Sequence, residues 1–144
     1  MWGIFNCHQS VEILVMSALE QPKLVENPTR TAQVALSVFF NIMDAWHVKA
    51  KDQRVLLGRP SESTFYNWKN GKVSSLSNDT LERISYIMGI YKALGILFPT
   101  REQADAWPLK PNKAFNGESA LDFMLKGSMI HLIDMRRYLD AQRG

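Results

Sequence analysis

Apolar side chains recur three and four positions apart through most of this 144-residue chain, the spacing that gathers them on one face of an α-helix. The pattern predicts a strong helix over 29–47 and a long helix over 77–97, which Pro99 ends because proline cannot continue it. The inward faces of the two helices are formed by Ala35, Val38, Phe39, Ile42, Ala45 and Trp46, and by Leu81, Ile84, Met88, Tyr91, Leu94 and Phe98. No segment reads as a β-hairpin, so the pattern predicts an all-α fold.

Capping residues and glycines mark the ends of the predicted helices. Thr29 or Thr31 is suited to cap the first strong helix, because a hydroxyl can accept from a free backbone N–H. A helix over 49–57 ends at Gly58, which tolerates a left-handed conformation. A third helix follows over 62–69.

Further helices are predicted before and after this group. One or two helical turns over 100–107 precede a loop, and helices over 118–126 and 128–141 complete the chain. Near the N-terminus, residues 10–20 are predicted to form a short amphipathic helix that either caps the core or pairs with a partner chain. The chain therefore divides into an extension (1–28), a central helical part (29–98) and a C-terminal part (99–144).

Composition limits the possible function classes. Apolar residues make up 46% of the chain and the net charge is only +3, so the chain can bury a core and is neither a disordered tail nor a polybasic coat. The lone Cys7 excludes an internal disulfide and a cysteine-rich zinc site, and fits a reduced, cytoplasmic setting. We do not expect the N-terminal residues to form a signal peptide, and no stretch is long enough for a membrane span, so no membrane partner is expected.

The excess positive charge is local. Residues 48–72 hold six basic and two acidic side chains, a charge of +4, so the remainder of the chain carries −1. A patch of this kind is typical of a protein that contacts a phosphate backbone, although a solvated helix face would look the same.

The spacing of the two short helices favours DNA binding. A nine-residue helix, a turn with glycine and a second short helix match helix-turn-helix geometry, with Val55, Leu57, Phe65 and Trp68 facing the core. The alternative is a purely structural three-helix core. The residues predicted to contact bases or phosphates are Lys49, Lys51, Arg54, Arg59, Ser63, Tyr66, Asn67, Lys69 and Lys72.

Two segments resemble a known family. The first runs Leu56-Leu57-Gly58 and then Ser63-Thr64-Phe65-Tyr66-Asn67-Trp68-Lys69-Asn70-Gly71. The second runs from Trp107 through Pro111-Asn112, Phe115-Asn116-Gly117, Ala120-Leu121-Asp122, Gly127 and Leu132 to Arg136-Arg137-Tyr138-Leu139-Asp140 and Arg143-Gly144. These segments are similar to the Xre-type helix-turn-helix and to the toxin-binding domain of Xre/MbcA/ParS antitoxins. The seven positions from Gly58 to Phe65 are one more than in the common repressor pattern.

The resemblance implies an antitoxin of a type II toxin–antitoxin system. Such proteins bind a RES-domain toxin that consumes NAD, hold it inactive, and repress their own operon, often as dimers within the toxin–antitoxin complex. The resemblance places toxin contacts at Trp107, Asn112, Phe115, Arg136, Arg137, Tyr138, Arg143 and Gly144. The carboxylate of Gly144 would occupy a site built for cofactor phosphate. The alternative is a stand-alone transcription regulator whose C-terminal helices only dimerise.

Two features of the C-terminal part have competing interpretations. Trp107 and Phe115 face either the core or a partner, and Asn116-Gly117 can supply a left-handed turn between them. Arg136, Arg137 and Arg143 are predicted to lie mostly outward, either as solvated cations that suit the helix C-terminus or as contacts to an acidic or phosphate-binding surface.

An enzyme is not expected. His8, His47 and His131 lack metal-ligand spacing, Cys7 has no partnered histidine, and the chain has no glycine-rich phosphate loop. Catalytic residues, metals and cofactors are therefore all predicted to be absent. The acids Asp122, Asp134 and Asp140 are expected to pair at the surface with Lys126, Arg137 and Arg136 respectively.

Overall fold

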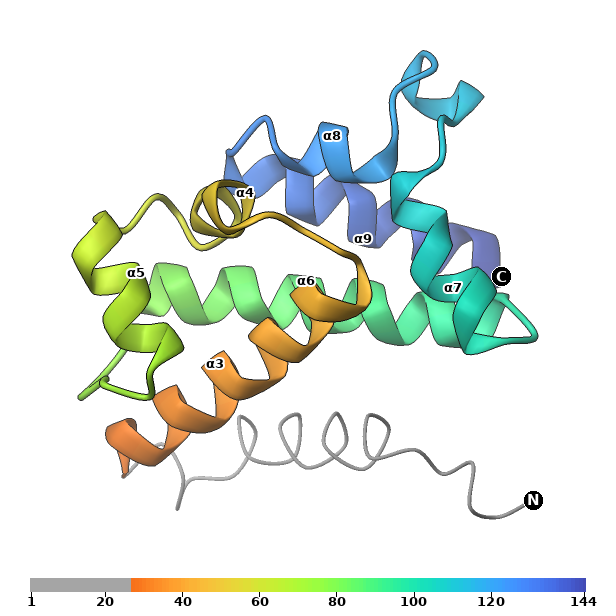
Figure 1. The fold of residues 1–144 in the computed structure, drawn as a ribbon. Helices are drawn as coiled ribbons and strands as arrows, with labels where there is room; N and C mark the ends of the chain where they lie inside the picture. The colour runs from red at the N-terminus through yellow and green to blue at the C-terminus, as the bar shows by residue number, and fades with distance from the viewer. Residues whose placement is uncertain (1–26) are drawn as a thin grey trace.

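The fold is built from helices, as a computed structural model shows for residues 27–144 (Figure 1). Within this part of the chain the only extended pairing is an isolated bridge between Pro111 and Ser119, so the all-α prediction is confirmed. The helix predicted over 10–20 lies outside the described residues.

The helices begin and end within two residues of their predicted bounds. Their order is α3 (Pro28–Ala45), α4 (Ala50–Leu56), α5 (Glu62–Lys69), α6 (Asn78–Leu97), α7 (Arg101–Ala106), η2 (Trp107–Leu109), η3 (Lys113–Phe115), α8 (Ala120–Met124) and α9 (Met129–Arg143), where η marks a 3₁₀ turn. The agreement follows from strong stop signals at glycine and proline and from serine caps such as Ser61 and Ser77.

The predicted cap of α3 is wrong. The Asn27 side chain accepts from the backbone N–H of Arg30 at 3.2 Å, whereas Thr29 donates to the carbonyl of Ser74 at 2.7 Å. Pro28 explains the shift, because its fixed φ and missing N–H suit the first position of a helix and leave capping to the residue before it.

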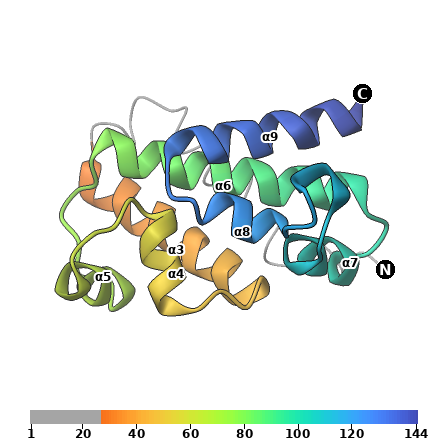
Figure 2. The same ribbon diagram turned by 90° about the horizontal axis from the view of Figure 1, so that it is seen from above.

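Helix α6 is the axis of the molecule. Helix α9 runs alongside it, α3 crosses its other side, and α5 and α7 lie near its opposite ends (Figures 1 and 2). One continuous core joins these helices, and its largest fully buried side chains include Trp46, Phe39, Phe65 and Met88.

At the end of α4 the sequence predicts Val55 and Leu57 to face the core, and the structure buries Leu56 and Leu57. Leu56 and Leu57 are each 1% exposed, whereas Val55 is only half-buried. Helix α4 ends at Leu56, so Leu57 leaves the helical spiral and follows its neighbour into the core. On α5 the predicted inward position Phe65 is fully buried, while Trp68 is half-buried against the core.

Arg83 joins α6 to the C-terminal part of the chain. Its side chain is 11% exposed, its Nε pairs with Asp79 Oδ2 at 3.0 Å, and its Nη1 donates to the carbonyl of Gly127 at 3.1 Å. The contact links positions 44 residues apart in the sequence, so it helps to fix how α8 and α9 lie on α6.

Replacing Arg83 tests this link. We expect Arg83→Ala to lower the free energy of unfolding by about 1–3 kcal/mol, because the carbonyl of Gly127 loses its buried charged donor. Urea unfolding measures the change, and Lys92→Ala, at an exposed position of the same helix, is the matched control with an effect within about 0.5 kcal/mol. Equal effects of the two substitutions would contradict the role given to Arg83.

Candidate functional site

Two consecutive left-handed residues shape the turn between α4 and α5. Gly58 has φ +91° and Arg59 has φ +61°, and Ser61 then caps α5 by accepting from the N–H of Thr64 at 3.2 Å. The Arg54 side chain holds this turn from inside, since its Nε and Nη2 both donate to the carbonyl of Pro60, at 3.2 and 3.1 Å.

The outward side of α5 presents a reading face, defined as Ser63, Tyr66, Asn67 and Lys69. All four residues are exposed, and Tyr66 is 46% exposed while it packs edge-on against the buried ring of Phe65. Hydroxyl, amide and ammonium groups on one short helix are the groups that contact base edges and phosphates in a major groove.

The basic residues predicted to contact DNA fall into two groups. Lys49, Lys51, Lys69 and Lys72 are exposed, and within residues 27–144 none of these four lysines forms an ion pair. The Arg54 and Arg59 side chains instead contact the protein: Arg54 binds the carbonyl of Pro60, and the guanidinium of Arg59 lies against Gly127. The four lysines are therefore the cations of the patch that no backbone group in the described part of the chain engages, although Arg59 is exposed as well.

Four aromatic side chains form a cluster in the C-terminal part: Trp107, Phe115, Phe123 and Tyr138. The rings of Trp107 and Tyr138 stack with centroids 6.4 Å apart, and Phe115 lies 5.0 Å from Tyr138 and 5.5 Å from Phe123. All four are half-buried, so each packs on the core and keeps an exposed edge. The two interpretations of Trp107 and Phe115, core and partner surface, are thus compatible.

Hydrogen bonds within the loop between η2 and α8 hold its two ends together. Asn112 donates its backbone N–H to Glu118 at 3.0 Å, and its side chain accepts from Ala114 N at 2.9 Å. Asn116 and Gly117 are both left-handed, with φ of +57° and +86°, as the sequence predicts. This hydrogen-bonded turn holds Phe115 against Tyr138.

Of the three arginines of α9 predicted to lie mostly outward, Arg137 and Arg143 are exposed and Arg136 is not. Arg136 is half-buried across α6, where a Cβ on Gly89 would overlap its guanidinium, and its Nε pairs with Asp140 Oδ2 at 3.1 Å. Arg143 also reaches Asp140, at 3.5 Å, while Arg137 is exposed. Because Gly89 has no side chain, the Arg136 guanidinium can pack against α6 at this position. Helical spacing alone does not predict this contact.

One of the three predicted ion pairs forms. Arg136 pairs with Asp140, but Lys126 pairs with Glu118 at 3.6 Å instead of with Asp122, and Arg137 forms no ion pair with Asp134. Helix α8 ends at Met124, so Lys126 lies beyond the helical geometry that would bring it over Asp122.

The two histidines in the described part of the chain, His47 and His131, have no arrangement suited to catalysis. His131 is half-buried, accepts from the backbone N–H of Ser128 at 3.3 Å and packs edge-on against Phe123, so it caps α9. His47 is exposed with φ +54°. In the described part of the chain, no three His, Cys, Asp or Glu side chains could together hold a metal ion. Cys7 and His8 lie outside that part.

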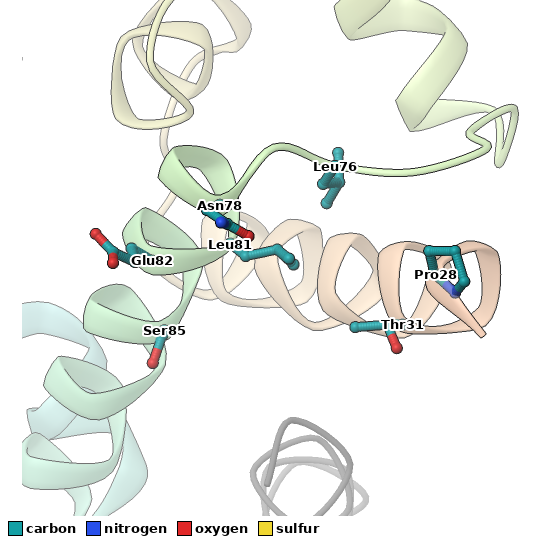
Figure 3. A pocket seen from close by; sticks show the side chains of 7 residues that line it. All are labelled: Pro28, Thr31, Leu76, Asn78, Leu81, Glu82 and Ser85. Carbon is teal, nitrogen blue, oxygen red and sulfur yellow. The ribbon is translucent and has the colours of Figure 1, made fainter. Parts of the chain in front are cut away.

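A groove beside the first turns of α3 and α6 has a volume of about 460 Å³ (Figure 3). Its walls come from Pro28, Thr31, Leu76, Asn78, Leu81, Glu82 and Ser85. Glu82 is the one ionisable side chain among them, so the groove lacks the paired acid and base that proton-transfer chemistry requires. Between residues 27 and 144, no helix combines the length and apolar character of a membrane crossing.

Comparison with known proteins identifies both halves of the chain. Residues 27–89 match the antitoxin Xre-like helix-turn-helix domain, and residues 93–144 match the antitoxin Xre/MbcA/ParS C-terminal toxin-binding domain. An uncharacterised protein of Sinorhizobium fredii, y4oB, is 50% identical over 109 residues, which cover 76% of this chain and 84% of that protein. No solved structure matches the chain.

The matches agree with the geometry. The first contains the turn and the reading face, the second contains the aromatic cluster and α9, and the two meet within α6. Neither domain family is enzymatic, so the chain acts by binding. It belongs to the Xre/MbcA/ParS family of antitoxins, in which a DNA-binding helix-turn-helix domain is joined to a toxin-binding domain.

Proposed function

We propose that this antitoxin inhibits a RES-domain, NAD-consuming toxin by blocking its active site, and that it represses its own operon. The observation that carries the proposal is the placement of its two surfaces. Helix α5, which carries the reading face, lies near one end of α6, and the C-terminal end of α9 lies near the other end (Figure 2). A protein of this shape can hold DNA and a toxin at the same time.

On the toxin side, the blocking element is the end of α9. Residues 141–144 are all exposed. Trp107 and Tyr138 give the adjacent surface exposed aromatic edges, which are common anchors in protein interfaces. In this proposal the segment that ends with Gly144 enters the cofactor cleft, while Arg137 and Arg143 contact acidic groups at its rim.

On the DNA side, the reading face enters the major groove and the four exposed lysines contact phosphates. Ser63, Tyr66 and Asn67 then read base edges, while Lys49 and Lys72 set position and affinity. A homodimer within the toxin–antitoxin complex, in the cytoplasm, would place two reading faces on half-sites about one helical turn apart.

The second candidate function is a stand-alone transcription regulator whose C-terminal helices dimerise. The match of residues 93–144 to a toxin-binding domain favours the antitoxin. The two functions differ in what the end of α9 does, since a stand-alone regulator needs no toxin contact there.

Removing residues 141–144 tests the toxin side. We expect the truncated chain to fold and bind its promoter as before, because these residues are exposed and the buried Leu139 is retained, but to leave the neighbouring RES toxin active. Growth and cellular NAD are measured with toxin and antitoxin expressed together, and Lys92→Ala is the control. A truncated chain that still protects the cells, or a neighbouring gene that leaves NAD unchanged when expressed alone, would contradict the proposal.

Two substitutions test the DNA side. Lys72→Ala should weaken binding similarly for all sequences and lower the slope of log affinity against log salt by about one, because one phosphate contact is lost. Asn67→Ala should instead change preference at one base pair by roughly 1–3 kcal/mol. Titration of promoter and scrambled DNA at several salt concentrations measures both effects. If both variants bind like the unaltered protein, α5 does not read DNA.

A further inference from the structure

The turn that leads into α5 touches the toxin-binding half of the chain. Nη1 and Nη2 of Arg59 lie 2.5 and 2.8 Å from the point where a Cβ on Gly127 would stand. Gly127 is buried in the turn between α8 and α9, with φ +93°. Because glycine has no side chain, the flat guanidinium rests directly on this turn, and any larger residue would push it away.

Arg83 of α6 contacts both of these turns. It donates to the carbonyl of Gly127 at 3.1 Å, and a Cβ on Gly58 would lie 3.1 Å from its Nε. Gly58, Arg59 and Gly127 therefore meet around one buried arginine of α6. The turn before α5 and the turn before α9 form a single packed unit.

The backbone of Arg59 is held in an unfavourable conformation. Its φ of +61° lies in the left-handed region, which costs a residue with a side chain about 1 kcal/mol or more. Its N–H donates to the carbonyl of Arg54 at 2.8 Å, and Arg54 in turn binds the carbonyl of Pro60. Pro60 directly precedes Ser61, the cap of α5, so whatever fixes this turn also fixes the direction of α5.

We propose that Arg59 is a positioning residue through which the toxin-binding half orients the DNA-reading helix. Its guanidinium acts on DNA through Gly127 and the turn, and it is not a phosphate ligand. This inference rests on the DNA-binding part of the proposed function. It replaces the role expected from the charge pattern, in which Arg59 contacts the DNA backbone.

Salt dependence separates the two roles. With the full chain and its promoter DNA, we expect Arg59→Ala to raise the Kd about tenfold, within the range typical of residues coupled by direct contact, while the salt slope stays unchanged. Lys72→Ala is the matched control, and its slope falls by about one. A slope that falls by about one in Arg59→Ala would show a phosphate contact and overturn the inference, as would an unchanged Kd.

Arg59→Lys gives an independent answer. Lysine keeps the charge but lacks the planar fork that lies on Gly127, so we expect a Kd as high as that of Arg59→Ala. Affinity restored by lysine would mean that charge alone matters, and would overturn the inference. Both variants change an exposed residue, so urea unfolding should show each of them folded.

A double substitution then tests the partner. Gly127→Ala inserts a methyl group where the guanidinium lies, so Gly127→Ala combined with Arg59→Ala should bind DNA no more weakly than Gly127→Ala alone. Additive losses would overturn the inference. If Gly127→Ala does not fold, the Arg59→Lys comparison decides alone. A loss of the proposed function looks different, because the unaltered chain would then fail to bind its promoter.

Discussion

The hydrogen bond from Arg83 to the carbonyl of Gly127 is the constraint around which the two halves of the molecule are arranged. A buried guanidinium needs partners, because an unpaired charge away from water is costly, and Arg83 finds them in Asp79 on its own helix and in the turn before α9. Since α9 starts from that turn and then follows α6 to its other end, the contact fixes where α9 begins. The position of the C-terminus at the far end of α6 follows from this starting point and the length of α9.

Glycine makes several such contacts possible. Helix α6 contains Gly89 and Gly95, although glycine inside a helix costs roughly 0.5–1 kcal/mol relative to alanine. A Cβ at either position would meet an arginine, Arg136 at Gly89 and Arg101 at Gly95. Arg101 also lies 3.6 Å from the ring centroid of Tyr91, where the cation–π attraction holds it. The two glycines cost helix propensity, but they leave room for the arginine side chains to pack directly on the backbone of α6. The packing of these side chains offsets the cost.

The sequence predicts the helices well and their long-range contacts poorly, for one physical reason. Apolar spacing, serine caps and glycine stops are local signals, so α5 and α6 are found to within one residue. The inward turn of Arg136 depends on Gly89, 47 positions earlier, and no local pattern reports such a pairing. At the candidate site, the exposed α5 residues follow from helical spacing. The contacts of Arg54 and Arg59 do not, because both depend on the shape of a turn with two left-handed residues.

The basic patch shows why counting charges overstates a binding surface. Its six cations look equivalent in the sequence, yet the two arginines differ from the lysines: Arg54 binds the carbonyl of Pro60, and the guanidinium of Arg59, although exposed, lies against Gly127. Their chemistry accounts for the difference: a planar guanidinium can donate twice to one carbonyl or lie flat on a glycine, whereas an ammonium on a flexible stem is strongly hydrated and stays in water. Arginine therefore builds the turn that carries α5, and lysine supplies the mobile positive charge around it. The electrostatic attraction to DNA and the orientation of the reading helix are thus separate properties of the same patch.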